Sequence, residues 1–387
     1  MFQNSLGQLP VSMKIASIEF IPVSLPLPAP FHPAWFPNVT QKSTDGTLIK
    51  VHADDGTVGY GWQNSFGTEV KIVGESRVFK DLILGKDVFN VEEIIRILTG
   101  ITYSMNTLDL LGVEMALWDI IGKSCGKPVH KLLGGAKERV KAYASTAMLK
   151  EPEEHARDAV KYRELGFRAI KIRIHHDKLE DDVAGIRAVR DALKKDEIEI
   201  MVDANQAATF SGPVWSYQRA LETARELEKL EVYWLEEPLF HEAHEDLARL
   251  SRAVELQIAG GEDEYGFFRF KDIIDHGCFD IIQADVSSSG GIFQLRKVAI
   301  LAESVGKLFV PHSFDTGLSM AAALQVIGAS PNSPYVEYAM EYPSLDLGHD
   351  KLLKTQIEVS KDGYVDIPSL PGLGVEINEE LIEKSRI

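Results

Sequence analysis

The sequence has little cysteine and no long apolar run. Cys125 and Cys278 are the only cysteines in 387 residues, too few for a disulfide framework and without the spacing of a metal site, so we expect buried thiols. No stretch of about 18 apolar residues could span a bilayer, and the first twenty residues lack the basic start and apolar run of a signal peptide. These absences predict a cytoplasmic protein that does not act on membranes.

Positive charge is also scarce. The chain has 41 Lys and Arg against 58 Asp and Glu, a formal net charge of −17, and no local basic cluster offsets the difference. Such a surface repels nucleic acid and anionic lipid. The length exceeds what one hydrophobic core usually serves, so we expect a large domain with a smaller partner domain.

The first third of the chain predicts an α+β domain over residues 1–138. Three strands are predicted there, at 14–24, 47–54 and 57–62. The turn Asp54-Asp55-Gly56 joins the last two as a hairpin. Helical periodicity follows over residues 69–135 and ends at Gly134-Gly135.

The rest of the chain alternates short apolar runs with amphipathic stretches. Strands are predicted at 141–145, 169–174, 198–205, 232–238, 257–262, 280–285, 307–312 and 335–339. Helical stretches between them include 151–165, 179–195, 214–229, 242–254, 293–305 and 317–327. Eight strands with helical crossovers are typical of a (β/α)8 TIM-type barrel, which we place at 139–355 with a tail at 356–387. The alternative, an open doubly wound sheet, needs a Gly-rich phosphate turn that residues 145–151 lack.

Polar residues close the predicted barrel strands. From the third strand onward they are Asp203, Glu236, Glu262, Asp285, His312 and Glu337, spaced by 33, 26, 23, 27 and 25 residues. Each spacing is about one βα unit, so these residues step around the rim where barrel active sites form. A single strand-end carboxylate is more often a helix N-cap or a surface charge, which does not explain such a series.

Three carboxylates end adjacent strands: Asp203, Glu236 and Glu262. Crowded carboxylates raise one another's pKa unless a cation neutralises them, so a metal is expected. All-oxygen ligation favours Mg2+, with Mn2+ as a substitute, over Zn2+, which recruits His or Cys. Glu237 and Asp263 are alternatives within their dipeptides, and Glu236 is preferred because Pro238 follows and Glu237 should point the other way along the pleat.

Two further pairs carry chemistry. His312 and Asp285 close neighbouring strands, and a carboxylate beside an imidazole fixes its tautomer and raises its basicity, as in a general base. A structural His with its acceptor is the alternative. Lys171 and Arg173 flank Ile172, so both face one side of the second strand and can oppose a metal-bound anion. Pairing of these cations with the strand-end carboxylates is the alternative.

Ordered motifs along nearly the whole chain resemble one family. The strings VDAN, WLEEP, GGED, QADVSSSGG, VPHSF and YVEY, together with GVEMALWDIIGK and the ending IPSLPGLGVEIN, resemble the enolase superfamily and, within it, the mandelate racemase group. The resemblance implies a capping domain, completed by the C-terminal tail, over a modified (β/α)8 barrel. It also implies a homo-oligomer.

The resemblance implies roles for the rim residues. Mg2+ would lie on Asp203, Glu236 and Glu262 and bind a carboxylate substrate whose α-proton is removed to give an enolate. His312 with Asp285 corresponds to the base on one face. Glu337 corresponds to the acid that hydrogen-bonds the substrate carboxylate or the enolate oxygen.

The second strand departs from the family pattern. Members that use bases on both faces carry Lys-x-Lys there, whereas this chain has Lys171-Ile172-Arg173. Arg is effectively always protonated, which makes Arg173 a poor base and a good clamp. We therefore expect a lyase in which His312 removes the α-proton and then protonates a departing β-hydroxyl, giving a 2-keto-3-deoxy acid from an aldonate or aldarate.

Other functions remain open at this point. A racemase, epimerase or lactone cycloisomerase with Lys171 as a second base is the main alternative, and a non-catalytic ligand-binding barrel is the third. The aromatic, Pro-rich segment Pro28 to Pro37 is expected to choose the substrate, unless it is only a stiff surface loop. For His175 a solvated loop position is the alternative to substrate contact. The expected substrate-binding residues are Arg173, Asn205, His32, Trp35 and His175.

Overall fold

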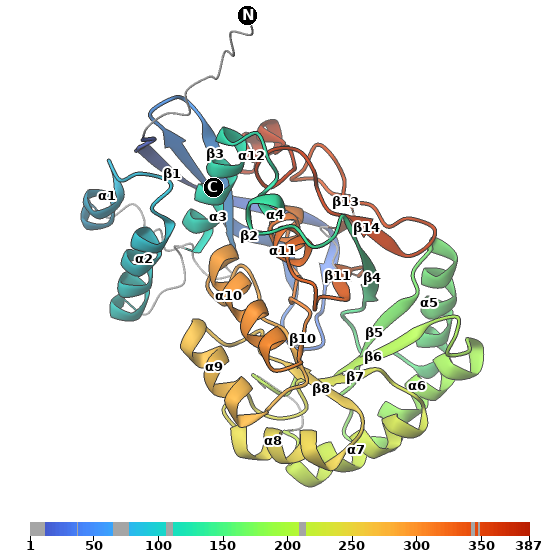
Figure 1. The fold of residues 1–387 in the computed structure, drawn as a ribbon. Coiled ribbons are helices and arrows are strands. Elements are labelled where there is room, and N and C mark those ends of the chain that lie inside the picture. The colour runs from blue at the N-terminus through green and yellow to red at the C-terminus, as the bar shows by residue number, and fades with distance from the viewer. Residues whose placement is uncertain are drawn as a thin grey trace, which may run out of the picture.

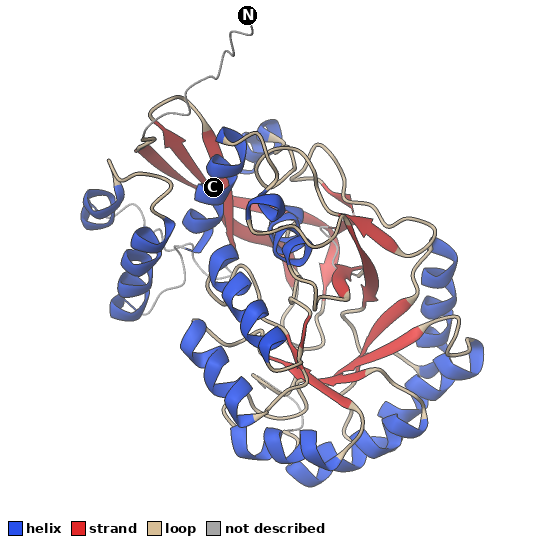
Figure 2. Cartoon of the chain, viewed as in Figure 1, coloured by secondary structure: helices blue, strands red, loops and turns tan. Residues whose placement is uncertain are grey.

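The computed structural model describes residues 12–36, 38–64, 77–105, 111–208, 214–341, 345–346 and 349–387. A small antiparallel sheet with its helices lies against a curled parallel sheet that helices surround (Figure 1). Strands occupy the interior of this larger unit and helices its outside (Figure 2). The predicted fold class, a capping domain beside a TIM-type barrel, is confirmed.

The N-terminal sheet has the order β1 (Ile15–Phe31), β2 (Gln41–Ala53), β3 (Val58–Asn64). The first two strands are longer than predicted because their far ends also pair, as far as Phe31 with Gln41. Residues 28–31 of the predicted loop therefore belong to a strand. Pro22 and Pro26 are tolerated in β1 because it is an edge strand, and their missing N–H groups lie on the same side of its backbone.

Helices α1 to α3 pack with this sheet, and α4 follows them along the chain. Their bounds are α1 (Arg77–Ile83), α2 (Val91–Met105), α3 (Leu111–Ser124) and α4 (Val129–Leu132). Of the predicted helical region, residues 69–76 and 106–110 lie outside the described part of the chain. Helix α3 lies directly on β3, where a Cβ on Gly61 would come within 1.8 Å of the Gly112 carbonyl oxygen. Glycine is therefore required for this close approach.

The barrel strands are β4 (Arg139–Ser145), β5 (Ala169–Arg173), β6 (Glu199–Asp203), β7 (Trp234–Glu236), β8 (Gln257–Gly260), β9 (Ile281–Ile282), β10 (Leu308–Phe309) and β11 (Tyr335–Ala339). Parallel pairing runs in the order β10-β9-β8-β7-β6-β5-β4-β11. No ladder joins β10 to β11 in the described chain. Across that gap the Ser313 amide donates to Glu337 Oε2 at 2.9 Å.

The helices of the barrel are α5 (Pro152–Leu165), α6 (Leu179–Ala192), α7 (Tyr217–Lys229), α8 (His244–Ala253), α9 (Phe267–His276), α10 (Gly291–Ser304) and α11 (Gly317–Ala329). A helix thus follows each strand from β4 to β10. The expectation of a helical crossover after all eight strands is wrong within the described residues. The chain leaves β11 for the short strands β12 (Leu345–Asp346), β13 (His349–Asp350) and β14 (Tyr364–Asp366) and for α12 (Glu379–Ser385).

The C-terminal tail returns to the capping sheet (Figure 1). Strand β14 pairs with the start of β4, and beyond it Glu379 of α12 accepts a hydrogen bond from Lys50 Nζ on β2 at 2.8 Å. The amide of Ile387 donates to the Pro22 carbonyl of β1 at 3.2 Å. The tail therefore completes the capping domain, while the boundaries at 138 and 355 stay predictions.

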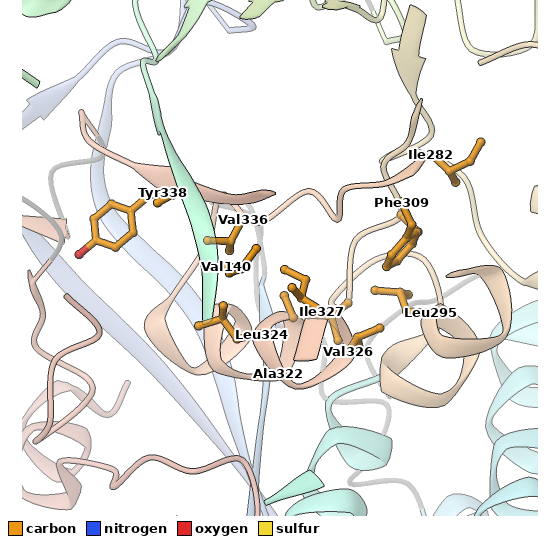
Figure 3. Close-up of a cluster of buried hydrophobic side chains, with 14 of the residues drawn as sticks. Val140, Ile282, Leu295, Phe309, Ala322, Leu324, Val326, Ile327, Val336 and Tyr338 are labelled. Atoms are coloured by element: carbon orange, nitrogen blue, oxygen red, sulfur yellow. The ribbon is translucent and has the colours of Figure 1, made fainter. Parts of the chain in front are cut away.

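The main core joins the two units through α11. Figure 3 shows Leu324 and Ile327 of α11 clustered with Val140 of β4 and Val336 of β11. Every residue of α11 except Met320 is buried, as expected of a helix that is apolar on all sides.

None of the described helices combines the length and apolar character that a membrane crossing requires. Both thiols are free, Cys278 buried and Cys125 half-buried, so the expectation of buried thiols is met in full by Cys278 alone.

One carboxylate connects the capping domain to the barrel. Glu114 of α3 accepts hydrogen bonds from the first-turn amides of α10, Ile292 at 2.8 Å and Phe293 at 2.9 Å, and from the Trp118 indole at 2.8 Å. Burial raises the pKa of Glu114 to about 7, although these three hydrogen bonds favour the ionised form. Protonation of this single group is therefore coupled to folding.

We predict that Glu114→Gln changes how stability depends on pH. The pKa of Glu114 in the folded protein, about 7, lies above its ordinary value of 4.5. Its stabilisation is therefore complete below pH 4.5 and is lost as pH rises through 7, by about 2 kcal/mol between pH 5 and pH 8. Urea unfolding of both proteins at the two pH values measures this loss. An equal change in wild type and variant would contradict it.

Candidate active site

The carboxyl ends of the barrel strands bring the predicted rim residues together. Arg173, Asp203 and Glu236 occupy neighbouring positions on β5, β6 and β7. Asp285 and His312 form an isolated parallel bridge just beyond β9 and β10. The series that was read from strand-end spacing is therefore a spatial cluster.

Lys171 lies at the centre of three carboxylates. Its Nζ is 2.6 Å from Glu236 Oε1, 2.8 Å from Glu337 Oε1 and 3.4 Å from Asp203 Oδ2, and its side chain is fully buried. Burial alone would lower the pKa of Lys171, but the surrounding negative charge of Glu236 and Glu337 raises it above its usual value. The amino group is therefore an ammonium ion, and its three N–H donors face these three carboxylates.

Arg173 is fixed by polar groups and by aromatic rings. Its guanidinium donates to Asp203, to the Thr146 carbonyl at 2.8 Å and to Asn205 Oδ1 at 3.2 Å. Its Cζ lies 5.1 Å from the centre of the Trp35 ring and 5.5 Å from that of Phe314. Cation–π contact and hydrogen bonds together hold this cation at the mouth of the barrel.

Of the two neighbouring acids at the end of β7, Glu236 points into the barrel. Besides Lys171, it accepts hydrogen bonds from Trp234 Nε1 at 3.0 Å and from Gln283 Nε2 at 2.8 Å. Glu237 follows with a positive φ of 46°, and its buried Oε1 has no hydrogen-bond partner among the described residues. Trp234 and Gln283 were missed at the sequence level. Each stands two residues before a predicted site residue, so the period-two rule would have found them.

Glu262 is only partly compensated by neighbouring groups. Its Oε2 is buried and has no hydrogen-bond partner in the described chain. Burial raises the pKa of Glu262 to about 8; nearby His312 lowers it, and Glu236 raises it further. The ligand oxygens of Asp203, Glu236 and Glu262 do not all lie within 4.8 Å of one another. Asp203 and Glu236 are buried and Glu262 is partly exposed, with one buried oxygen unsatisfied; this set suits a hard cation that would draw the three carboxylates together.

His312 forms a dyad with Asp285. Its Nδ1 donates to Asp285 Oδ2 at 2.7 Å, while the amides of Ser287 and Ser288 donate to Asp285 Oδ1 at 2.6 and 3.1 Å. The two serines were not singled out from the sequence. Burial would lower the pKa of His312, but Glu262, then other carboxylates, raise it to about 10. The dyad leaves Nε2 free to face the site, 3.6 Å from Glu262 Oε1.

Glu337 is surrounded by donors. Ser145 Oγ donates to its Oε1 at 2.7 Å, and the Ser313 amide donates to its Oε2 at 2.9 Å. Burial would raise the pKa of Glu337, but Lys171 and then His312 lower it below its usual range. Glu337 is therefore an ionised acceptor that positions Lys171, and its predicted role as a donor to substrate stays a prediction.

The segment between β1 and β2 reaches the barrel mouth (Figure 1). The Ala34 amide donates to the Ala147 carbonyl at 2.8 Å, and His175 Nε2 donates to the Ala34 carbonyl at 3.1 Å. Trp35 meets Phe314 edge to face at 5.4 Å.

The other residues predicted to contact substrate here have different outcomes. Pro37 lies outside the described residues. Exposed His32 lies 3.4 Å from Thr40 Oγ1. His175 is buried rather than solvated. Trp35, against Arg173, is the capping residue that the structure brings to the cluster.

Comparison with known proteins agrees with this architecture. Residues 154–381 match the family described as enolase C-terminal domain-like, and residues 18–134 match the mandelate racemase / muconate lactonizing enzyme N-terminal domain. An arabinonate dehydratase of Saccharolobus solfataricus is 34% identical over 348 residues, 87% of this chain and 89% of that protein. A D-galactarolactone cycloisomerase of Agrobacterium fabrum is 31% identical over 358 residues, 88% of this chain and 91% of that protein.

A solved structure has the same fold as this chain. D-glucarate dehydratase from Agrobacterium tumefaciens, crystallised in complex with magnesium, superposes with a TM-score of 0.84 at 27% identity and covers 96% of this chain and 99% of its own. Fold, motifs and sequence identity thus agree over nearly the full length. The chain belongs to the enolase superfamily, in its mandelate racemase/muconate lactonizing enzyme group.

Proposed function

We propose that the protein is a Mg2+-dependent acid-sugar dehydratase. It would convert an aldonate or aldarate into a 2-keto-3-deoxy acid by removing the proton α to the carboxylate and eliminating the β-hydroxyl as water. The observation that carries this proposal is the His–Asp dyad at the barrel mouth, His312 with Asp285 at 2.7 Å, beside three strand-end carboxylates. The dehydratases among the relatives support the same reaction class.

The metal would be held by Asp203, Glu236 and Glu262, with Mn2+ as a substitute for Mg2+. A bound divalent ion supplies positive charge beside the substrate carboxylate and neutralises the carboxylates that raise the pKa of His312. The relative crystallised with magnesium supports a divalent ion here. The unsatisfied Oε2 of Glu262 supports its inclusion in the ligand set.

His312 would carry the proton in both steps. Because Nδ1–H is donated to Asp285, the lone pair of the neutral imidazole is on Nε2, the atom that faces the site. Nε2 takes the α-proton from substrate and becomes an imidazolium. The same atom then returns a proton to the departing hydroxyl, which leaves as water, and the enol product tautomerises to the keto acid.

The second strand would supply charge rather than a second base. Lys171 is held as an ammonium ion by Glu236, Glu337 and Asp203. Arg173 is a permanent cation between Trp35 and Phe314. Both would oppose the negative charge that develops on the substrate, together with the nearby amide of Asn205.

An isomerase is the second candidate. The 31% identical cycloisomerase favours it, because α-proton removal can also begin epimerisation or lactone opening. In that case Lys171 would have to lose a proton and act from the opposite face. Dehydration and isomerisation differ in product composition: the first gives a 3-deoxy keto acid that has lost one water, whereas the second gives an isomer of the substrate.

Turnover of an acid-sugar panel tests the proposed reaction and its base together. Proton NMR of the Mg2+-loaded protein in D2O, with a panel of aldonates, aldarates and sugar lactones, should reveal a new signal from a monodeuterated C3 group beside the keto carbon of an aldonate or aldarate that has lost water. In His312→Asn the rate should fall by roughly 10²–10⁴, because the group that moves the proton is gone. His52→Asn, at a half-exposed His paired with Glu19 on the capping sheet, is the matched control.

Three outcomes would contradict this prediction. Deuterium at the α-carbon with no loss of water would identify the isomerase. A His312→Asn variant as fast as wild type would remove His312 from the mechanism. No turnover of any panel member would argue against an acid sugar as substrate.

Stabilisation by Mg2+ should distinguish the proposed ligand Glu262 from its neighbour Asp263. Wild type and Asp263→Asn should gain thermal stability on adding Mg2+, by about 2.7 kcal/mol at one hundred times Kd, whereas Glu262→Gln should gain little. Without metal, Glu262→Gln should be more stable than wild type, since burial raises the pKa of Glu262 to about 8 and its charge is unfavourable. Scanning calorimetry measures both. Loss of the Mg2+ response in Asp263→Asn alone would assign the site to Asp263.

A further inference from the structure

We propose a second metal site, for Zn2+, on the outer wall of the barrel between α8 and α9. Its ligands are His244, Asp272 and His276. This site is separate from the barrel mouth and does not depend on the proposed function.

The three side chains already converge. One ligand atom from each lies within 4.8 Å of the others, and among the described residues this is the one such group of three His, Cys, Asp or Glu side chains. Asp272 lies between the two imidazoles, with Oδ2 3.4 Å from His244 Nδ1 and Oδ1 3.4 Å from His276 Nδ1. The rings are 5.8 Å apart between centroids.

The helices explain why these residues meet. Asp272 and His276 are four residues apart on the last turn of α9, so both lie on one face. His244 opens α8, on the neighbouring helix. Transition-metal sites commonly take two ligands from one helical turn and a third from an adjacent element, because the helix backbone fixes the distance between the first two.

The nitrogens that lie beside the Asp272 carboxylate are the Nδ1 atoms of both imidazoles. His276 Nδ1 also donates to the Asp272 carbonyl at 2.8 Å, a hydrogen bond that Zn2+ binding through this atom would replace. His244 Nε2 is buried and has no hydrogen-bond partner within the described structure. The His244 side chain is 14% exposed and those of Asp272 and His276 about half exposed, so water can complete the coordination from outside.

Charge and ligand type select the ion. The two cations that precede Asp272 on α9 have other partners: Lys271 pairs with Asp275, and Arg269 pairs with Glu264 at 2.7 Å, so Asp272 remains available. Two imidazoles and one carboxylate suit Zn2+, whereas the all-oxygen set at the barrel mouth suits Mg2+. The two sites therefore prefer different ions, and each can be filled separately.

The test is calorimetric titration of the untagged full-length protein with Zn2+ in buffer that contains saturating Mg2+. One equivalent of Zn2+ should bind to wild type. His276→Ala and Asp272→Asn should each weaken binding by more than the roughly 10–100-fold that loss of an outer-shell partner costs. His52→Ala, which removes a surface His from a His–carboxylate pair with Glu19, should bind as wild type does. Zn2+ should also raise the Tm of wild type and not that of His276→Ala.

Titration of Glu262→Gln separates the new site from the barrel mouth. If the site is on the wall, this variant still binds one equivalent of Zn2+, whatever its effect on Mg2+. Wild type that binds no Zn2+, or His276→Ala and Asp272→Asn that bind it as tightly as wild type, would overturn the proposal. Binding lost only in Glu262→Gln would assign the Zn2+ to the mouth and overturn it as well. Half-exposed His276 ends its helix, so its loss should leave the fold intact, which circular dichroism checks.

Discussion

Buried negative charge at the barrel mouth is the constraint on which the site depends. Strand ends bring Asp203, Glu236 and Glu337 into an interior that water does not screen, with partly exposed Glu262 beside them. Lys171 and Arg173 compensate part of this charge, and Glu262 retains an oxygen with no partner among the described residues. A cation, and then an anionic substrate opposite the two basic groups, would complete the balance. The same charge explains why the chain has a poor second base: a Lys held by three carboxylates stays protonated.

Contacts between the two domains meet near the barrel mouth. Glu114 of α3 caps α10, and the indole of Trp62 on β3 donates to Asp315 beyond β10 at 3.3 Å. The segment between β1 and β2 docks through Ala34 and places Trp35 on Arg173. Residues of the capping domain therefore contact a cation of the barrel, so the two domains are physically connected at the site.

Prediction from sequence succeeded where a local rule applied. Strand periodicity found all eight barrel strands, and one polar residue per βα unit located the rim. Prediction failed where strand length, chain path or burial depends on a partner that is distant in the sequence. The length of β1 depends on β2, the eighth strand is followed by a tail that pairs with β4, and the burial of His175 depends on the Ala34 carbonyl. Trp234 and Gln283 were overlooked although the alternation of the strand marks them.

The sequence by itself determined the barrel, its capping domain, and the residue types at each strand end, because these follow from periodicity and from the chemistry of carboxylates and imidazole. Only the tertiary structure decided which charges meet. It placed Lys171 among three carboxylates, left Glu262 unsatisfied and brought His244 beside Asp272 and His276. Such contacts join residues far apart along the chain, and their distances are set by packing of whole strands and helices rather than by any local pattern.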